Sequence, residues 1–382
     1  MLAKLYVKQA RSWPKYKKIK IVKYHLFLYS RNMNKLFKLY NIKIDDYYQK
    51  HFEFLEQTRN QFDYYEVLPD YKKNDFKKYI SQINDKIKDL DTGFNFIEKT
   101  IEYDNFFMKL KPGKINKIAL KAITSIEANK SILKNLKRFK TKSNFHDNIV
   151  YDMYNTSTGR LTVESGPNIL TLPVRCRSIF ESRFKEGKIV SIDFNNLEPR
   201  FVLKISGKDI VDKDIYSFLA NILDLNIDRS VMKKAVISRL YGSSINTLNN
   251  QIPTEKVDKI KSLIEEYFLV EKILDLSKNV NAEMQFRYNY FGRPIKNFDI
   301  TQENIIINNY VQSSCVDMSL MYFTDLCNLI DRNRCVPLFV IHDALVLDVE
   351  KDYLKDIQKI VKKGYDHKTL GNFPISLEDF QK

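Results

Sequence analysis

Two apolar runs that meet aspartates constrain the fold more than any other feature of the sequence. The run 188–194 (KIVSIDF) predicts a buried strand that ends at Asp193. The runs 338–341 and 345–349 predict two further strands joined at Asp343. Burying a lone carboxylate is costly, so an acid in such a place usually faces a cation or another partner. Strands lying side by side would bring the two carboxylates together, although 150 positions separate them.

Such a pair of carboxylates suits two magnesium ions, held about 3.5–4 Å apart. Taken singly, each aspartate is more often a strand-end residue that caps a turn. The pair therefore gains its weight from the residues around it.

The rest of the chain has the composition of a folded globular protein. Its 382 residues are 44% hydrophobic and include only 10 Gly and 10 Pro, which supplies a core and argues against low complexity. Residues 1–148 have a helical, lysine-rich pattern, and a long helix is expected over 301–328. The stretch 155–173 is non-periodic, as in an ordered functional loop. We expect an α+β body with a helical N-terminal appendage.

The charge balance favours a polyanionic partner. The chain has 63 Lys and Arg against 47 Asp and Glu, which gives a net charge of +16. Phosphate neutralisation with counterion release is a strong attraction that does not depend on base sequence. Codon usage in an AT-rich genome explains the charge equally well, because Lys, Asn, Ile, Tyr and Phe are all abundant.

Cysteine usage and the lengths of the apolar runs indicate the cellular compartment of the chain. The four cysteines show no metal-ligand spacing and the five histidines form no cluster, so we expect reduced thiols in a reducing compartment. The N-terminus lacks the apolar core of a signal peptide, and no run of about 18 apolar residues could span a membrane. These features predict a soluble protein of the cytoplasm.

A second candidate site is the segment 228–242 (DRSVMKKAVISRLYG). Asp228 can begin a helix and Gly242 can end it. One face of that helix is a stripe about 18 Å long that contains Arg229, Lys233, Ile237 and Tyr241. Cations at one end and an aromatic ring at the other match a nucleoside triphosphate in length and polarity. An ordinary amphipathic helix with a basic outer face is the alternative.

A third candidate is the stretch 131–143, which contains five cations and no acid. The cations are Lys134, Lys137, Arg138, Lys140 and Lys142. This face could grip DNA, or it could be the solvated side of a helix.

Together these blocks resemble the polymerase domain of the family A DNA polymerases, the DNA polymerase I type. In chain order they are TGRL at 158–161 with PN at 167–168 and Pro173; the motif A acid Asp193 with Glu198 and Arg200; motif B at Arg229, Lys233, Tyr241 and Gly242; FGR at 291–293; VQ at 311–312; and the motif C pair His342 and Asp343. Six features in the correct order argue against coincidence. The resemblance extends from about residue 155 to 349 and is only positional before that.

The resemblance implies a metal site. It implies that Asp193, Asp343 and the backbone carbonyl of Phe194 ligate two magnesium ions, with Mn²⁺ as a substitute. The family usually has an acid after the motif C pair, where this chain has Ala344, so that acid cannot be essential here.

It also implies a nucleotide site. Arg229 and Lys233 would bind the incoming triphosphate, with Lys233 acting in catalysis, and Tyr241 would close the insertion site. Glu198 would leave no room for a 2′-hydroxyl on the sugar. Ile237 stands where most members have Phe or Tyr, so the base and sugar would meet an aliphatic wall.

Contacts to DNA are implied at further positions. Those near the primer end and minor groove are Arg160, Asn168, Asn308, Gln312 and His342. The resemblance also raises the expectation that Lys134, Lys137 and Arg138 grip duplex DNA from a thumb-like region.

The implied fold is a right hand with a mixed or antiparallel palm sheet and mostly helical fingers and thumb. We expect a thumb-like region at 1–150, palm at 151–204 and 301–382, and fingers at 205–300. The N-terminal region leaves no room for a proofreading exonuclease beside the thumb. The sequence DVE at 348–350 has the look of a nuclease D-x-E motif, but it is expected to be a surface turn at the end of a hairpin.

These features predict a DNA-directed DNA polymerase, a nucleotidyltransferase of DNA replication, that extends a primer 5′ to 3′. Its expected partners are primer-template DNA and deoxynucleoside triphosphates, with separate helicase, primase or processivity proteins. The size and composition suggest a phage-like source. The alternatives are a single-subunit RNA polymerase, whose motif B is similar, and an inactive nucleic-acid-binding module.

Overall fold

The computed structural model describes residues 33–43, 45–50, 68–90, 96–208, 214–223, 227–240, 253–278, 280–282, 285–296 and 299–381. The chain divides into two compact units, 1–92 and 93–382. The described part of the first unit contains α2 (Met33–Leu39) and α5 (Asp70–Leu90), and there Tyr48 stacks on Tyr79 with ring centroids 4.7 Å apart. The predicted division into thumb, palm and fingers stays a prediction.

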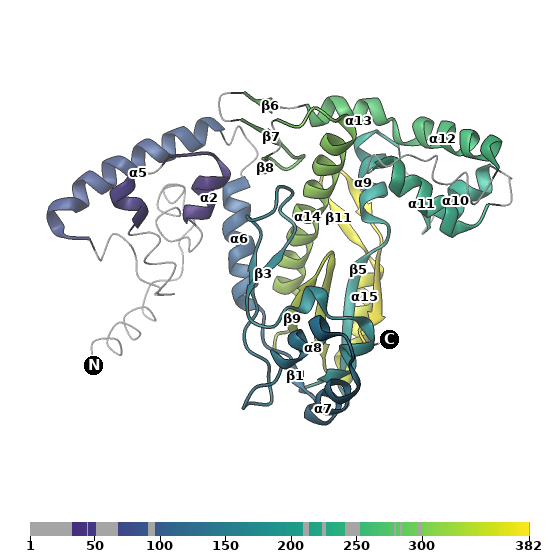
Figure 1. The fold of residues 1–382 in the computed structure, drawn as a ribbon, viewed down its shortest axis with the longest axis horizontal. Coiled ribbons are helices and arrows are strands. Elements are labelled where there is room, and N and C mark those ends of the chain that lie inside the picture. The colour runs from purple at the N-terminus through teal and green to yellow at the C-terminus, as the bar shows by residue number, and fades with distance from the viewer. Residues whose placement is uncertain are drawn as a thin grey trace. The chain divides into compact units, whose positions relative to one another are not determined.

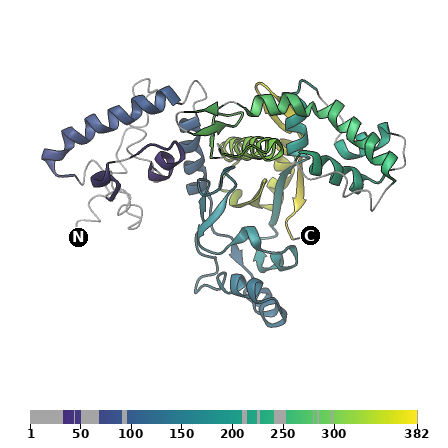
Figure 2. The same ribbon diagram turned by 45° about the horizontal axis from the view of Figure 1, so that its top comes forward.

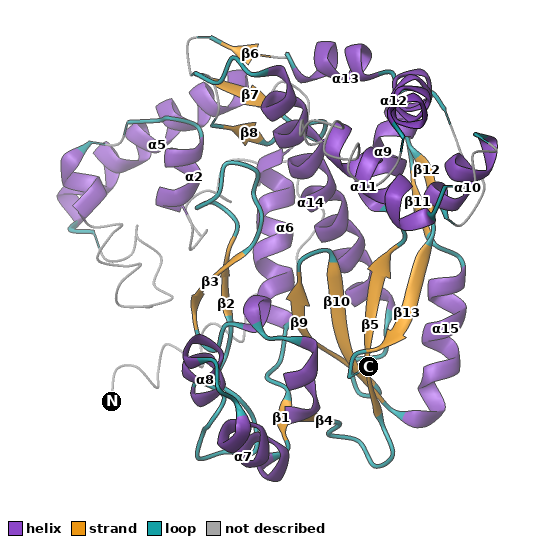
Figure 3. Cartoon of the chain, turned by 45° about the vertical axis from the view of Figure 1, so that its right-hand side comes forward, coloured by secondary structure: helices purple, strands orange, loops and turns teal. Residues whose placement is uncertain are grey.

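The second unit is built on a four-stranded antiparallel sheet in the order β13-β5-β10-β9 (Figure 3). Its strands are β5 (Lys188–Phe194), β9 (Cys335–Ile341), β10 (Ala344–Val349) and β13 (Ile375–Asp379). The three predicted strands are thereby confirmed, and β13 is an additional one. Because β10 and β13 border β5 on its two sides, Ala344 and Ser376 lie opposite Asp193.

One face of the sheet packs against α14 (Glu303–Leu329), which confirms the long helix predicted at 301–328. Phe194 lies on this face, with its ring centroid 5.4 Å from that of Tyr322. On another side, α14 packs against α6 (Phe96–Lys109) through Phe106 and Phe323, 6.3 Å apart. Figure 2 shows α14 in the centre of this unit. Successive strand side chains point to opposite faces, so Asp193 points to the other face of the sheet.

An aromatic cluster covers part of the face that bears Asp193. Phe339 is on this face, because it pairs with Val346, which in turn pairs with Ser191. The ring centroid of Phe180 lies 5.1 Å from that of Phe339. The centroids of Phe139 and Phe380 lie 5.6 and 5.9 Å from that of Phe180. The aromatic cluster therefore anchors one end of this face, while Asp193 lies toward the other end.

Two further groups of elements lie at opposite ends of the sheet (Figures 1 and 3). At one end are β1 (Lys114–Ile115), α7 (Lys117–Ile126), α8 (Lys130–Lys137) and β4 (Phe180–Glu181). At the other are α9 (Leu197–Ile205), α10 (Ile215–Ile222), α11 (Arg229–Leu240), α12 (Thr254–Phe268) and α13 (Val270–Ser277).

Smaller elements complete the unit. They are β2 (Val150–Asp152), β3 (Thr162–Ser165), β6 (Val280–Asn281), β7 (Phe286–Tyr288), β8 (Pro294–Ile295), α15 (Leu354–Lys362), β11 (Tyr365–His367) and β12 (Gly371–Phe373). Of the helices in the described ranges, none combines the length and the apolar character needed to cross a bilayer.

A buried ion pair ties several of these elements together. The Arg293 guanidinium donates from Nη2 to Asp317 Oδ1 at 2.6 Å and from Nε to Oδ2 at 2.9 Å. Both side chains are at most 1% exposed. Arg293 Nη1 also donates to the Met153 carbonyl at 3.1 Å, and Asn289 Nδ2 donates to Asp317 Oδ2 at 2.6 Å. One cation thus links α14, the turn before β8 and the chain just after β2.

The glycine of the TGRL block is required by the same cation. Gly159 has a φ of +76°, and a Cβ built on it would lie 2.7 Å from Cζ of Arg293. Both the left-handed backbone and the contact with the guanidinium exclude a larger residue. The TGRL and FGR blocks are therefore in direct contact.

The predicted surface turn at 348–350 is wrong. Asp348 lies inside β10 and is fully buried. Its carboxylate accepts hydrogen bonds from Ser182 Oγ at 2.5 Å, from the Arg183 amide at 2.9 Å and from Arg183 Nε at 3.0 Å. A buried acid needs such partners, and these lie about 165 positions away in the sequence.

We expect Asp317→Ala to lower the free energy of unfolding by about 3–5 kcal/mol, because it leaves the Arg293 cation buried and unpaired. Urea denaturation monitored by circular dichroism measures the loss. The matched control is Asp356→Ala, which removes an exposed pair with Lys359 (3.0 Å) and should cost less than about 1 kcal/mol. Similar losses in the two variants would contradict the role given to the buried pair.

Candidate active site

Asp193 is a partly buried acid with an unsatisfied oxygen. Its Oδ1 is buried and accepts no hydrogen bond from the described residues. Burial raises the pKa of Asp193 to about 7, the charges of Asp343 and Glu378 add to the rise, and a hydrogen bond from the Phe194 backbone opposes it. A carboxylate in this condition favours a proton or a bound cation.

Asp343 lies beside Asp193 in the turn between β9 and β10. The turn consists of His342 and Asp343, both exposed, and Ala344 immediately after it pairs with Asp193. His342 has a φ of +55°. A left-handed residue at the first position of a two-residue loop fits the twist of a hairpin. The sheet therefore brings together the two aspartates that the sequence predicts as partners.

These acids fit a divalent metal that keeps other oxygen ligands. Mg²⁺ is usually bound through one or two carboxylates plus water and substrate oxygens. Within the described ranges, no three His, Cys, Asp or Glu side chains are grouped closely enough to hold an ion by themselves. The unsatisfied Oδ1 of Asp193 and the exposed Asp343 carboxylate could supply the oxygens of such an incomplete set.

Glu198 lies near the same acids, in the first turn of α9. The helix begins after Asn196, which is left-handed with a φ of +56°. Burial raises the pKa of Glu198 to about 7, Arg160 opposes the rise and Asp343 adds to it. Glu198, Arg160 and Asp343 are therefore within electrostatic reach of one another.

The rest of motif A secures this geometry locally. Arg200 is 3% exposed and its Nε donates to the Asn195 carbonyl at 3.0 Å. Pro199 is the third residue of α9, where a helix amide has no intrahelical partner.

On α11 the cations of the stripe face outward. Arg229 and Lys233 are exposed and Ile237 is half-buried, while the opposite side buries Met232, Ala235 and Val236. Tyr241 and Gly242 lie outside the described residues.

Arg229 has a carboxylate partner. Its Nε donates to Asp214 Oδ2 at 2.6 Å and its Nη2 donates to Oδ1 at 3.1 Å. Asp214 is the residue before α10, and the guanidinium also lies 5.5 Å from the centroid of the Tyr216 ring.

Two of the residues expected to contact DNA lie on one face of α14. Thr158 of the TGRL block donates from Oγ1 to Gln312 Oε1 at 3.0 Å. Asn308 is one turn earlier, and its Oδ1 is buried without a partner among the described residues. Arg160 is exposed.

Asn168 has a local structural role. Its Oδ1 accepts from the Leu170 amide at 3.2 Å and so caps a short 3₁₀ helix, 169–171. Its backbone amide donates to Asn135 Oδ1 at 3.1 Å, and its carbonyl accepts from Asn135 Nδ2 at 2.7 Å. The loop thereby docks on α8, whose Lys134 and Lys137 are exposed, as is Arg138 just after it.

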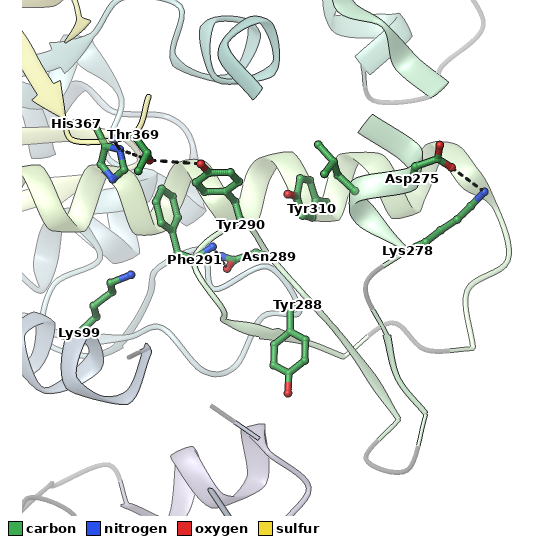
Figure 4. A pocket seen from close by; sticks show the side chains of 11 residues that line it. Lys99, Asp275, Lys278, Tyr288, Asn289, Tyr290, Phe291, Tyr310, His367 and Thr369 are labelled. Carbon is green, nitrogen blue, oxygen red and sulfur yellow. Dashed lines mark hydrogen bonds and ion pairs between the residues drawn. The ribbon is translucent and has the colours of Figure 1, made fainter. Parts of the chain in front are cut away.

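A cavity of about 730 Å³ is a separate feature. Aromatic rings from three stretches of the chain line it, among them Tyr288, Phe291, Tyr310 and His367 (Figure 4). Its polar side chains bond to one another, since Thr369 Oγ1 lies 3.2 Å from His367 Nδ1 and 3.4 Å from the Tyr290 hydroxyl. None of the residues predicted for catalysis or binding lines it.

Comparison with known proteins places this chain in a family. Residues 61–378 match the model of "DNA polymerase family A". This match covers most of the chain. The chain belongs to DNA polymerase family A. Polymerases of this family generally depend on divalent metal ions.

Individual family A relatives are distant. The chain is similar to the thermostable DNA polymerase I of Thermus aquaticus, at 23% identity over 257 residues, which are 58% of this chain and 30% of that protein. DNA polymerase I of Lactococcus lactis subsp. cremoris is 24% identical over 268 residues, 61% of this chain and 30% of that protein. The matches thus span about 30% of the length of these relatives.

The fold is also that of a family A polymerase domain. The chain is similar to the "POL domain of Pol1" from M. smegmatis, solved in complex with a DNA primer-template and dNTP. The TM-score is 0.51 at 18% identity, covering 66% of this chain and 51% of that one. The predicted α+β right-hand fold is therefore confirmed.

Two features of this family A site were not predicted from the sequence. The first is β13, which places Ser376 opposite Asp193 and Glu378 near enough to raise its pKa. The alternation of Phe373, Ile375 and Leu377 signals a strand there, but not its partner. The second is Asp214, which precedes an apolar helix and reads from sequence as an N-cap.

Asp193→Asn should stabilise the metal-free protein at alkaline pH. The folded pKa of about 7 lies above the usual 3.8, so this group's stabilisation is full below about pH 4 and is lost as the pH rises through 7. At pH 8 we expect the free energy of unfolding of the variant to be about 1–3 kcal/mol higher than that of the wild type. The gain should shrink at pH 5, where the wild-type carboxyl is mostly protonated.

Urea denaturation in EDTA at the two pH values measures this difference. A variant less stable than the wild type at pH 8, or a gain equal at both values, would show that ionised Asp193 is not held at a cost.

Proposed function

We propose that this chain is a DNA-directed DNA polymerase that extends a primer 5′ to 3′ and releases pyrophosphate. The observation that carries the proposal is the pair Asp193 and Asp343 at one end of a sheet, in a chain of DNA polymerase family A. Burial raises the pKa of Tyr216 to about 12, Glu198 adds to the rise and Arg229 opposes it. Tyr216 is thus within reach of both, which supports one continuous site from the acids to α11.

We infer that Asp193, Asp343 and the carbonyl of Phe194 hold two magnesium ions, with manganese as a substitute. The unsatisfied buried oxygen of Asp193 supports this assignment. Such ions, when bound, supply charge that activates the primer hydroxyl and stabilises the leaving pyrophosphate. The protein's part is to fix the carboxylates on paired strands, so that the ligand oxygens need no rearrangement.

The incoming deoxynucleoside triphosphate would lie along α11. The exposed side chains of Arg229 and Lys233, at the N-terminal half of the helix, suit its phosphates. Lys233 would also steady the phosphate in the transition state, Ile237 would meet the base and sugar, and Tyr241 would close the site. Glu198, near Asp343, would exclude the 2′-hydroxyl.

Primer-template DNA would occupy the face of the sheet that bears Asp193. Arg160, Asn308 and Gln312 would contact the minor groove, Asn168 would support the nearby loop, and His342 would lie beside the primer end. The exposed cations Lys134, Lys137 and Arg138 would bind the duplex backbone. In this proposal 1–150 is a thumb-like region, 205–300 the fingers and the remainder the palm. Helicase, primase or processivity proteins are proposed as separate partners.

Primer extension tests the proposal directly. With magnesium, a primed DNA template and saturating dNTPs, the wild type should extend the primer, and Asp193→Ala or Asp343→Ala should abolish turnover. Both variants should still fold and bind primer-template, as circular dichroism and fluorescence anisotropy can verify. Substantial turnover in either variant would rule out the two-metal assignment, and no extension by the wild type would rule out the function.

Sugar choice separates this proposal from an RNA polymerase. We expect the wild type to prefer dATP over ATP opposite template T by about 10²-fold or more, because a 2′-hydroxyl would clash with the half-buried Glu198 side chain. Glu198→Ala should raise ribonucleotide incorporation markedly. The measurement is the ratio of kcat/KM for the two nucleotides in both proteins. Equal use by the wild type would favour an RNA polymerase instead.

A further inference from the structure

Arg229, proposed above to bind the triphosphate, already holds an anion of the protein itself. Asp214 engages its guanidinium with both carboxylate oxygens, at 2.6 and 3.1 Å. Two parallel N–H···O bonds of this kind are the strongest geometry available to an arginine and a carboxylate. A phosphate group presents two oxygens to the same fork, so Asp214 and a phosphate would compete for it.

The carboxylate of Asp214 is held by two side chains, that of Arg229 and that of Ser217 in its own helix. Asp214 is the N-cap residue of α10, where an aspartate usually accepts hydrogen bonds from the first helix amides. It makes no side-chain capping bond there. Instead, Ser217 Oγ donates to Oδ2 at 2.5 Å and so steadies the carboxylate that faces Arg229.

The pair is exposed enough to exchange partners. The side chains of Arg229 and Asp214 are 51% and 31% exposed, unlike the fully buried Arg293–Asp317 pair. An ion pair in contact with water is weak, so an incoming polyphosphate can displace the carboxylate. The displaced Asp214 stays solvated, which keeps the exchange reversible.

We propose that Asp214 occupies the phosphate-binding fork of Arg229 in the nucleotide-free protein and must be displaced by the incoming triphosphate, so that it sets nucleotide affinity. This inference rests on the proposed polymerase function. Asp214 acts through Arg229 and is therefore a positioning residue. Replacing Asp214 by Asn removes the charge and keeps the shape, and it should tighten nucleotide binding. Substituting a residue with only a structural role would not tighten binding.

The test is nucleotide binding by the full chain on a dideoxy-terminated primer-template. The variants are Asp214→Asn, Arg229→Ala, their combination, and Glu265→Gln as a matched control. Glu265 pairs with Arg239, which lies at the C-terminal end of α11, whereas Arg229 lies at its N-terminal end. The side chains of Glu265 and Arg239 are 34% and 30% exposed. The control therefore removes a similar ion pair from the same helix.

We expect Asp214→Asn to lower the Kd for the matched dNTP by about 3- to 10-fold. In extension assays, KM should fall by a similar factor with kcat little changed. Arg229→Ala should weaken binding, and adding Asp214→Asn to it should restore nothing, because the fork is gone. Glu265→Gln should leave the Kd unchanged.

Three outcomes would overturn the inference. They are an unchanged or raised Kd in Asp214→Asn, a gain of the same size in the Arg229→Ala background, and an equal gain in Glu265→Gln. If the wild type extends primers, any of these outcomes rules out the inference and leaves the proposed function standing. A wild type that neither binds dNTP nor extends removes the proposed function and the inference with it.

Discussion

The buried pair of Arg293 and Asp317 is the interaction on which the second unit, 93–382, most depends. A cation and an acid in the interior are tolerated only when each satisfies the other and their remaining hydrogen-bonding groups find partners. Here those partners come from α14, from Asn289 and from the chain after β2. Gly159 completes the enclosure because its missing side chain lets the backbone meet the guanidinium. Loop and helix must therefore fold together, which fixes the TGRL residues beside Gln312.

The end of the sheet that bears Asp193 is organised in the opposite way. Instead of pairing its charges, the structure leaves Asp193 with an unsatisfied oxygen and sets Asp343 beside it. Rigid strands hold the like charges together, and the aromatic cluster around Phe180 anchors the far end of the same face. A site of this kind is stabilised by what it binds. Its unpaired acids therefore lower the stability of the unbound protein while they provide for binding.

Local sequence patterns predict much of the fold, but the pairing of residues far apart in the sequence could not be predicted from them. The apolar runs beside Asp193 and Asp343 identify β5, β9 and β10, because a buried strand needs such a run. The same signals could not reveal that β13 borders β5, since an alternating pattern names no partner. They misjudged Asp348, whose burial depends on Arg183 far away in sequence. They also missed Asp214, because a residue before a helix reads as a cap whether or not it holds an arginine.

The order of the strands has a consequence for how the chain is made. β5 is synthesised well before β10 and β13, the two strands that pair with it. Until they emerge from the ribosome, an apolar strand has both edges open, and its contacts span more than 150 positions. Such late closure slows folding and exposes the nascent strand to wrong partners. Lys188 and Asp193, which place charges toward the two ends of β5, would then also disfavour aggregation during synthesis.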